Sequence, residues 1–196
     1  MVLAVWVPEW VLDEDRRTLR VGETLAEWLT FSEVQRLPHV APVRVQSIRG
    51  LARPLPRWAG TEDGHHPVSI SVDGATLYWD APRPADGSVE LTGVVSLNNI
   101  DAPDAFPVTR GVIRRVWMEW QATGTGTAGQ RVPPPPPGAS SHYEEVPVSY
   151  LPGFDGGPGA GFRHAPAAVS PQALRWSGCL VDLEPSVPVA SIGETP

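Results

Sequence analysis

Apolar and polar residues alternate over several short segments of this chain, and such alternation is typical of β-strands with one buried face. In the segment 66–80, HPVSISVDGATLYWD, every second residue from Val68 onward is apolar, with a break only at Asp73-Gly74. An Asp-Gly pair accommodates the positive backbone φ angles of a type I′ turn. The segment therefore predicts a β-hairpin.

Further strands are expected in the first 121 residues. They lie at 2–7, 41–48, 88–100 and 109–121. We expect the last two to pair with each other across the loop DAPDAFPV, because its prolines and aspartates are typical turn residues. On 109–121 neither face is wholly polar, which is expected for a barrel strand whose outer side is partly covered.

The segment VGETLAEWLTFSEVQRL has two interpretations. Thr24 and Glu27 have the spacing of a helix capping box, which favours a helix. Leu25, Leu29 and Phe31 instead fall on one side of an extended chain, which favours a strand. We expect a strand at 24–30, followed by a helical turn.

The eight tryptophans bear on both the core and a binding surface. In the opening VWVPEW, Trp6 and Trp10 are four residues apart, so on a regular strand they would share a face. Tryptophan buries a large apolar area, so most of the eight belong to the core. Those expected inside are Trp6, Trp28, Trp79 and Trp120. The candidates for contact with a ligand or partner are Trp10, Trp58 and Trp117, together with Arg115.

The composition changes after Gln121, where many of the 23 prolines and 19 glycines are found. The fold class expected is all-β, a small and partly open β-barrel of about six to eight mostly antiparallel strands. Its predicted parts are a barrel domain at 1–121, a Pro/Gly-rich flexible excursion at 122–172 with a strand near 142–150, a closing strand at 173–184 and a disordered tail at 185–196. The excursion contains the R-x-x-P-x-x-P pattern Arg131, Pro134 and Pro137, which is either a docking ligand or a stiff spacer.

Charge and cysteine usage exclude several classes of function. The formal net charge of −7 disfavours a nucleic-acid partner, since a polyanion repels an acidic chain. Cys179 is the only cysteine, which excludes a disulfide framework and a cysteine zinc site. We find no signal peptide and no apolar run that would span a membrane, so we expect a cytoplasmic protein with no membrane partner.

The segment TEDGHHPV holds the strongest candidates for chemistry, namely Glu62, Asp63, His65 and His66 as metal ligands. Adjacent histidines point in opposite directions on an extended chain, and no second spaced cluster completes a zinc site. The other interpretation is a solvated turn before the hairpin. We find no Gly-x-Ser-x-Gly nucleophile motif and no phosphate-binding loop, so we predict no catalytic residue and no cofactor.

Three aliphatic-aromatic stretches share a pattern with a known family. They are VWVPEW with VGETLAEW, GVIRRVWMEW, and LRWSGCLVDLE. Together they resemble an uncharacterised actinobacterial family of small, tryptophan-rich proteins with a domain of unknown function. The resemblance implies an all-β fold and carries over no activity. Val11 and Leu12 stand where that family has cysteines, so it implies no thiol-based role here.

The sequence leaves three classes of function open. We expect a cytoplasmic, non-enzymatic binding or interaction module that takes a protein or peptide partner. The alternatives are a small hydrolase or metal-dependent enzyme that uses His65, His66 and nearby carboxylates, and a structural accessory subunit of a larger complex. The oligomeric state is not determined by the sequence.

Overall fold

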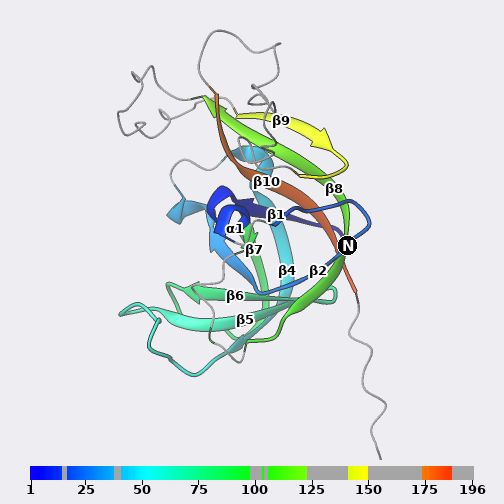
Figure 1. Cartoon of the computed structure of the whole chain (residues 1–196). Helices are drawn as coiled ribbons and strands as arrows, with labels where there is room; N and C mark the ends of the chain where they lie inside the picture. The colour runs from blue at the N-terminus through cyan, green and yellow to red at the C-terminus, as the bar shows by residue number, and fades with distance from the viewer. Residues whose placement is uncertain are drawn as a thin grey trace, which may run out of the picture.

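The structure is a computed structural model, and the chain is all-β apart from short helical turns (Figure 1). The residues that it describes are 1–14, 17–37, 41–97, 103, 106–122, 141–149 and 174–186. In these ranges the strands are β1 (Leu3–Pro8), β2 (Thr24–Glu27), β3 (Leu29–Glu33), β4 (Gln46–Pro54), β5 (His66–Val72), β6 (Ala75–Ala81), β7 (Gly87–Leu97), β8 (Thr109–Ala122), β9 (Ser141–Val146) and β10 (Leu174–Pro185). The helical turns are α1 (Glu9–Glu14), η1 (Val34–Arg36) and η2 (Pro42–Arg44).

Five of the strands, β3 to β7, form a closed barrel. Around the ring, β3 pairs with β6, β6 with β5, β5 with β4, β4 with β7, and β7 again with β3. The β3–β6 pair is parallel and the other four pairs are antiparallel. A closed ring leaves no unpaired sheet edge, which protects a small β protein from pairing with other chains.

Strand β7 closes the ring because it pairs with β4 on one edge and with β3 on the other. Its first part pairs with β4, from Gly87 to Gly93, and its last part pairs with β3, from Gly93 to Leu97. At Gly93 both partners are paired at once, one on each edge, since this residue lies opposite both Glu33 and Gln46. A Cβ atom at Gly93 would lie 2.1 Å from the carbonyl oxygen of Ser32, so this position requires a residue without a side chain.

The remaining strands extend from β7 as an outer sheet. Strand β1 pairs in parallel with β7 at Val5 and Trp6, and pairs in antiparallel fashion with β10. Strand β10 pairs with the long strand β8, whose other edge carries β2 near its start and β9 near its end. Figure 1 shows β8, β9 and β10 beside one another, while the start of β8 reaches the β5–β6 hairpin, where Thr109 Oγ1 accepts a hydrogen bond from the backbone nitrogen of Thr76.

The inward faces of both parts form one hydrophobic core. On β6, Ala75, Leu77 and Trp79 are buried and alternate with the partly exposed Thr76 and Asp80. A bulge between β8 and β10 shifts the register beside Leu183. Because of this shift, the buried apolar residues of β8 change from an odd position, Ile113, to the even positions Val116, Met118 and Trp120.

The prediction of an all-β barrel is confirmed, with a closed ring of five strands and further strands outside it. The hairpin is confirmed too: β5 and β6 pair from His66 to Ala81, and Asp73 and Gly74 have φ angles of 38° and 89°. The segment 24–37 forms two strands followed by a 3₁₀ turn, as expected.

Three local predictions were wrong. The strands at 88–100 and 109–121 do not pair with each other in the described residues, because β7 pairs with β1, β3 and β4 while β8 pairs with β2, β9 and β10. The segment 41–48 begins as the 3₁₀ turn η2, where proline occupies the first helical position. Trp6 and Trp10 do not share a strand face, since β1 ends at Pro8 and α1 carries Trp10.

The tryptophans expected inside divide into two groups. Trp79 and Trp120 are buried, whereas Trp6 and Trp28 are half-buried. Most of the Pro/Gly-rich excursion, with Arg131, and nearly all of the predicted tail lie outside the described residues. Strand β9 occupies part of the region in which a strand was expected near 142–150. Within the described ranges, no helix has the length and apolar character that a membrane span requires.

We expect Gly93→Ala to lower the free energy of unfolding by about 1–3 kcal/mol, because the added methyl group meets backbone of β3 that cannot rotate away. The measurement is urea unfolding followed by tryptophan fluorescence. Thr92→Val, at the exposed neighbouring position, is the control and is expected to stay within about 0.5 kcal/mol of the wild type. Equal stability of the two variants would contradict the close approach of β3 and β7.

Candidate functional site

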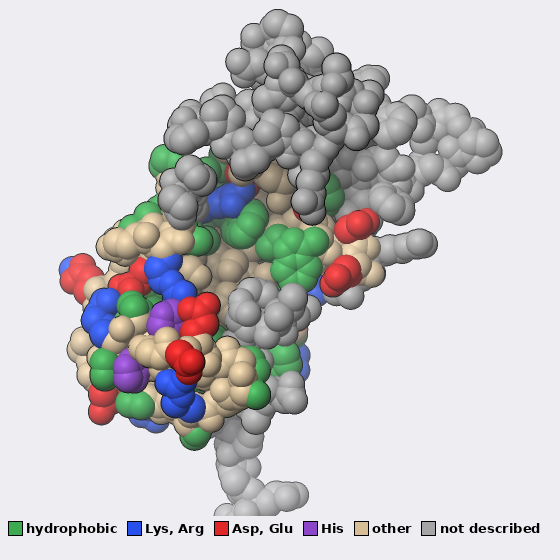
Figure 2. Space-filling view, turned by 90° about the vertical axis from the view of Figure 1, so that its left-hand side faces the viewer, with side chains coloured by type: hydrophobic (Ala, Val, Ile, Leu, Met, Phe, Trp, Pro, Cys, Tyr) green, Lys and Arg blue, Asp and Glu red, His purple; other side chains and the backbone are tan. Residues whose placement is uncertain are grey.

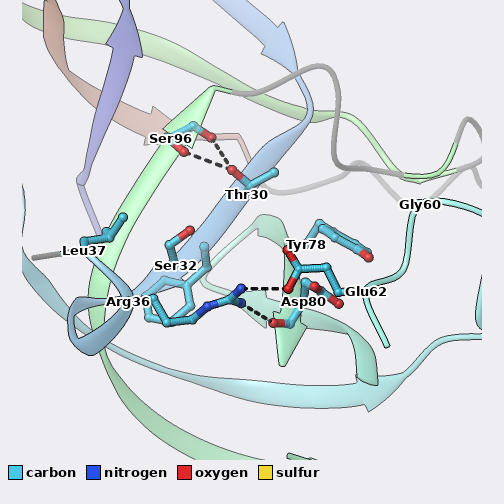
Figure 3. Close-up of a pocket in the computed structure, with 10 residues that line it drawn as sticks. Thr30, Ser32, Arg36, Leu37, Gly60, Glu62, Tyr78, Asp80 and Ser96 are labelled. Carbon is cyan, nitrogen blue, oxygen red and sulfur yellow. Dashed lines mark hydrogen bonds and ion pairs between the residues drawn. The ribbon is translucent and has the colours of Figure 1, made fainter. Parts of the chain in front are cut away.

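A pocket lies on the outer face of the barrel wall formed by β6, β3 and β7 (Figure 3). Paired positions on adjacent strands share a face of the sheet. Thr30 lies opposite Tyr78 on β6 and opposite Ser96 on β7, so these three side chains form one row. Ser32 and Asp80 lie two residues further along β3 and β6 on the same outward face. The outward face of these three strands therefore carries polar groups, whereas the face toward the barrel interior is apolar.

Two further segments cover this wall and make it concave. Arg36 and Leu37 reach it from η1, and Gly60 and Glu62 reach it from the loop 55–65 between β4 and β5. The pocket has a volume of about 240 Å³ and is open to solvent on one side. On the face of the molecule shown in Figure 2, histidine, arginine and acidic side chains lie side by side, next to patches of hydrophobic side chains.

Hydrogen bonds fix the walls of the pocket. Thr30 Oγ1 and Ser96 Oγ are 2.9 Å apart. Arg36 donates from Nη1 to the backbone oxygen of Asp80 at 3.0 Å and from Nη2 to Glu62 Oε2 at 3.3 Å, which ties η1 to β6 and to the covering loop (Figure 3). The pocket is therefore held open by contacts between its own walls.

An aromatic cluster supports one side of the pocket. Trp58 donates from Nε1 to the hydroxyl oxygen of Tyr78 at 2.9 Å, and the two rings meet edge to face. Tyr78 in turn meets Phe106 edge to face, and Trp28 and Leu55 pack against this pair. Such edge-to-face contacts stabilise the pair beyond simple burial of apolar area. The cluster anchors the loop 55–65 to the barrel.

Three potential ligand groups converge at the rim of the pocket. His65 Nδ1 lies 2.6 Å from Asp80 Oδ2 and 3.1 Å from Glu62 Oε2. The ligand atoms of the three residues lie within 4.8 Å of one another. Asp80 Oδ1 is buried and has no hydrogen-bond partner among the described residues. A buried carboxylate oxygen without a donor is costly, so this atom points to a ligand that supplies one or to a cation.

The backbone around His65 is held by a neighbouring cation. Arg57 donates from Nη1 to the backbone oxygen of His65 at 2.8 Å and from Nη2 to the backbone oxygen of Glu62 at 3.2 Å. His65 N also donates to the backbone oxygen of Glu62 at 3.1 Å, which closes a tight turn. These contacts place the imidazole against Asp80 without using either ring nitrogen.

The residues named from the sequence as metal ligands do not all lie in one cluster. His65 is half-buried and belongs to the cluster. His66 begins β5, is exposed, and lies opposite Ala81. Asp63 is fully exposed and lies 3.7 Å from Arg57. Adjacent histidines thus do point apart. Of the candidates named from the sequence, Glu62 joins His65, and the third member of the cluster is Asp80, which the sequence did not indicate.

The sequence-derived partner residues do not form one patch. Trp58 belongs to the aromatic cluster beside the pocket, and Trp10 is exposed on α1. Trp117 and Arg115 do come together on the outer sheet, where the guanidinium carbon lies 5.2 Å from the ring centroid. Arg115 also pairs with Asp182 at 3.1 Å. Only Trp58 lies near the pocket.

Sequence reasoning missed most of the residues that line the pocket. Those on strands are Thr30, Phe31, Ser32, Tyr78, Asp80 and Ser96. Part of the signal was visible, since polar residues of 76–80 alternate with buried ones. The parallel pairing of β3 with β6 had no local signal, and it is this pairing that joins the polar positions into one wall.

A second polar cluster is buried where η2 packs on the outer sheet. Arg44 forms an ion pair with Glu119, and their side chains are only 6% and 0% exposed. The Arg44 guanidinium lies 4.0 Å from the ring centroid of Trp6, and Tyr143 donates its hydroxyl to Glu119 Oε1 at 2.9 Å. Burial, followed by the charge of Glu119, raises the pKa of Tyr143 to about 12. The cluster ties η2, β1, β8 and β9 together.

Cys179 lies in the core of β10 and is fully buried. Its sulfur is 3.4 Å from the sulfur of Met118. Burial, as the largest cause, raises the pKa of the thiol to about 12. The side chain therefore packs as a small apolar group, as the sequence indicated.

We expect Arg44→Met to cost about 3–5 kcal/mol of unfolding free energy, because it leaves Glu119 charged and buried without its partner. Adding Glu119→Gln is expected to recover much of this loss, since the amide carries no charge. Urea unfolding of the wild type, the single variant and the double variant measures both effects. A single variant as stable as the wild type would show that the ion pair is not buried in solution.

The thiol pKa predicts a loss of stability at high pH. Between pH 9 and pH 12 a thiol in the unfolded chain ionises, while the folded chain keeps Cys179 protonated. The unfolded state then binds fewer protons than the folded state, so the free energy of unfolding falls as the pH rises through this window. Urea unfolding across the window is expected to show a shallower fall for Cys179→Ala. Identical slopes for both proteins would refute the assignment.

Comparison with known proteins finds no protein similar to this chain. No family model matches the chain, and neither a curated protein nor a solved structure matches it. The resemblance to the actinobacterial tryptophan-rich family stays a prediction. The function is therefore inferred from the pocket and the residues around it.

Proposed function

We propose that this protein is a binding module that takes a small polar molecule in the pocket between η1, the loop 55–65 and the outer face of β3, β6 and β7. The observation that carries the proposal is the convergence of hydroxyl and carboxylate groups from separate strands on one surface pocket of about 240 Å³. Ligand sites commonly combine a preformed cavity with a few convergent polar groups.

The size and chemistry of the pocket restrict the ligand. Its volume is below the range of about 300–1,000 Å³ that is common for drug-sized ligands, so it suits a smaller molecule. Thr30, Ser32 and Ser96 offer hydroxyl groups that donate or accept. Asp80 Oδ1 requires a donor, which a ligand hydroxyl or amine supplies. A molecule with several hydroxyl or amino groups, such as a monosaccharide or an amino alcohol, matches these groups.

This proposal keeps the class of function that the sequence favoured, a non-enzymatic binding module. It replaces the protein or peptide partner expected there with a small polar molecule as the ligand. Of the residues expected to contact a partner, Trp58 supports the pocket through Tyr78. The hypothesis of a protein partner at Trp10, Trp117 and Arg115 stays a prediction, as does the cytoplasmic location.

A panel of monosaccharides, amino sugars and amino alcohols tests the proposal by saturation-transfer NMR in a buffer with EDTA. We expect at least one compound to bind the wild type and to lose binding in Ser32→Leu, whose longer side chain fills the pocket from β3. Ser71→Leu is the matched control, because Ser71 is an exposed serine on β5 outside the pocket.

The outcome is decided by the pattern across the three proteins, after circular dichroism has shown that each is folded. Binding by the wild type and Ser71→Leu but not by Ser32→Leu supports the pocket. Binding that survives Ser32→Leu unchanged places the ligand elsewhere. No binding by any compound of the panel rejects the polar ligand as proposed.

A further inference from the structure

We propose that Glu62, His65 and Asp80 form a binding site for a divalent transition-metal ion such as Zn²⁺. The site lies at the rim of the pocket and shares Glu62 and Asp80 with its lining. It does not depend on the small polar ligand, because the metal ion alone is expected to bind.

The separation of the ligand atoms fits one ion. Zinc lies about 2.0–2.2 Å from imidazole nitrogen and carboxylate oxygen, so neighbouring ligand atoms of a tetrahedral site are about 3.3 Å apart. The distances from His65 Nδ1 are 2.6 Å to Asp80 Oδ2 and 3.1 Å to Glu62 Oε2. An ion placed between the three groups therefore requires shifts of side chains and not of backbone. The Nδ1 proton, which lies between these groups, leaves to solvent.

A separate observation also points to a cation at this place. Asp80 Oδ1 is buried without a hydrogen-bond donor among the described residues. The hydrogen bond from His65 is made to Oδ2 and leaves Oδ1 without a partner. A cation bound to this carboxylate offsets the cost of burying its charge. The orphaned oxygen thus lies on one of the three proposed ligands.

Two of the three ligands are already held in place. Asp80 lies on β6 within the barrel ring, opposite Pro67 of β5. His65 is fixed by the hydrogen bond from Arg57 to its backbone oxygen and by the turn to Glu62. Preorganised ligands lose little conformational entropy when the ion binds, so the metal-free fold already contains most of the site.

Glu62 is the adjustable ligand. Its side chain is 65% exposed, and one oxygen contacts Arg36 Nη2 at 3.3 Å. In the metal-free protein Arg36 balances part of the carboxylate charge. Rotation of the exposed Glu62 side chain exchanges this contact for the ion, while Arg36 keeps its hydrogen bond to the backbone oxygen of Asp80. Figure 3 shows Arg36 reaching toward both Glu62 and Asp80.

The donor set indicates the class of metal. One imidazole and two carboxylates suit zinc, cobalt, nickel, manganese or iron(II), and the set offers no thiolate for a soft ion. Calcium prefers six to eight oxygen ligands, which three side chains with one nitrogen do not provide. With three protein ligands, a fourth position is left for water or for a group in the pocket.

Isothermal titration of the metal-free protein with Zn²⁺ alone tests the site, with Co²⁺ absorption in the visible range as a second readout of coordination. The chain supplies matched controls, because each proposed ligand of the loop has a neighbour of the same chemistry outside the cluster. His65→Ala is compared with His66→Ala, and Glu62→Gln with Asp63→Asn. Asp80→Asn completes the set.

We expect one Zn²⁺ per chain for the wild type, His66→Ala and Asp63→Asn, with affinities equal within a factor of about three. Substituting His65, Glu62 or Asp80 is expected to weaken binding about tenfold or more, which is the scale of losing one interaction that holds a metal. Circular dichroism shows whether each variant is folded, and a substitution that unfolds the protein is replaced by His65→Gln or Asp80→Ser.

Two results would overturn the site. One is the absence of saturable Zn²⁺ binding by the wild type, and the other is an equal loss in His66→Ala and His65→Ala. Neither result bears on the small polar ligand, since that ligand is tested in EDTA. A failure of the ligand panel likewise leaves the titration with Zn²⁺ alone unaffected.

Discussion

The fold depends on one strand, β7, having three neighbours. A strand has two edges, and β7 fills one of them with β3 and shares the other between β4 and β1. At Gly93 β3 and β4 are paired on opposite edges, and the backbone of Ser32 comes too close there for any side chain. Without β3 on one edge and β4 on the other the ring of β3 to β7 would stay open, and without the change from β4 to β1 the outer sheet would have no edge on which to begin.

The pairing of β7 with β3 also positions the pocket. Because Gly93 lies opposite Glu33, the antiparallel register places Ser96 opposite Thr30, and the parallel pairing of β3 with β6 adds Tyr78. The barrel interior takes the apolar residues of each strand, and strict alternation then sends the polar residues outward. A polar outer wall becomes a pocket only where η1 and the loop 55–65 cover it.

Charged groups serve different purposes in the two polar clusters. Arg44 and Glu119 are almost fully buried and pair with each other, so they join η2 to the outer sheet with little surface left for a ligand, although Arg44 Nε has no hydrogen-bond partner among the described residues. At the pocket rim Asp80 also keeps an oxygen without a donor, and Glu62 is exposed and able to turn. The difference is that the Asp80 oxygen belongs to a group of three potential ligands beside a cavity, which is why it points to binding.

The sequence by itself determined the local structure. Alternation over 66–80 and the Asp73-Gly74 pair specified a hairpin, because side-chain period and turn geometry are properties of neighbouring residues. The same reasoning found His65 and the strand–turn order of 24–37. It failed for 88–100 and 109–121, since two adjacent strands in sequence need not pair when other edges offer better partners.

Only the tertiary structure decided which distant residues meet. Thr30 joins Tyr78 and Ser96 through the pairing of β3 with β6 and β7, which carries no mark in the local pattern. Asp80 comes beside His65 through the β5–β6 hairpin, but the convergence of both with Glu62 at the rim of a pocket appears only in the folded chain. Alternation states that a residue faces outward, but it does not state which strand lies beside it. The physical reason is that pairing partners are chosen by closure of the ring and burial of the whole core, which are properties of the entire chain.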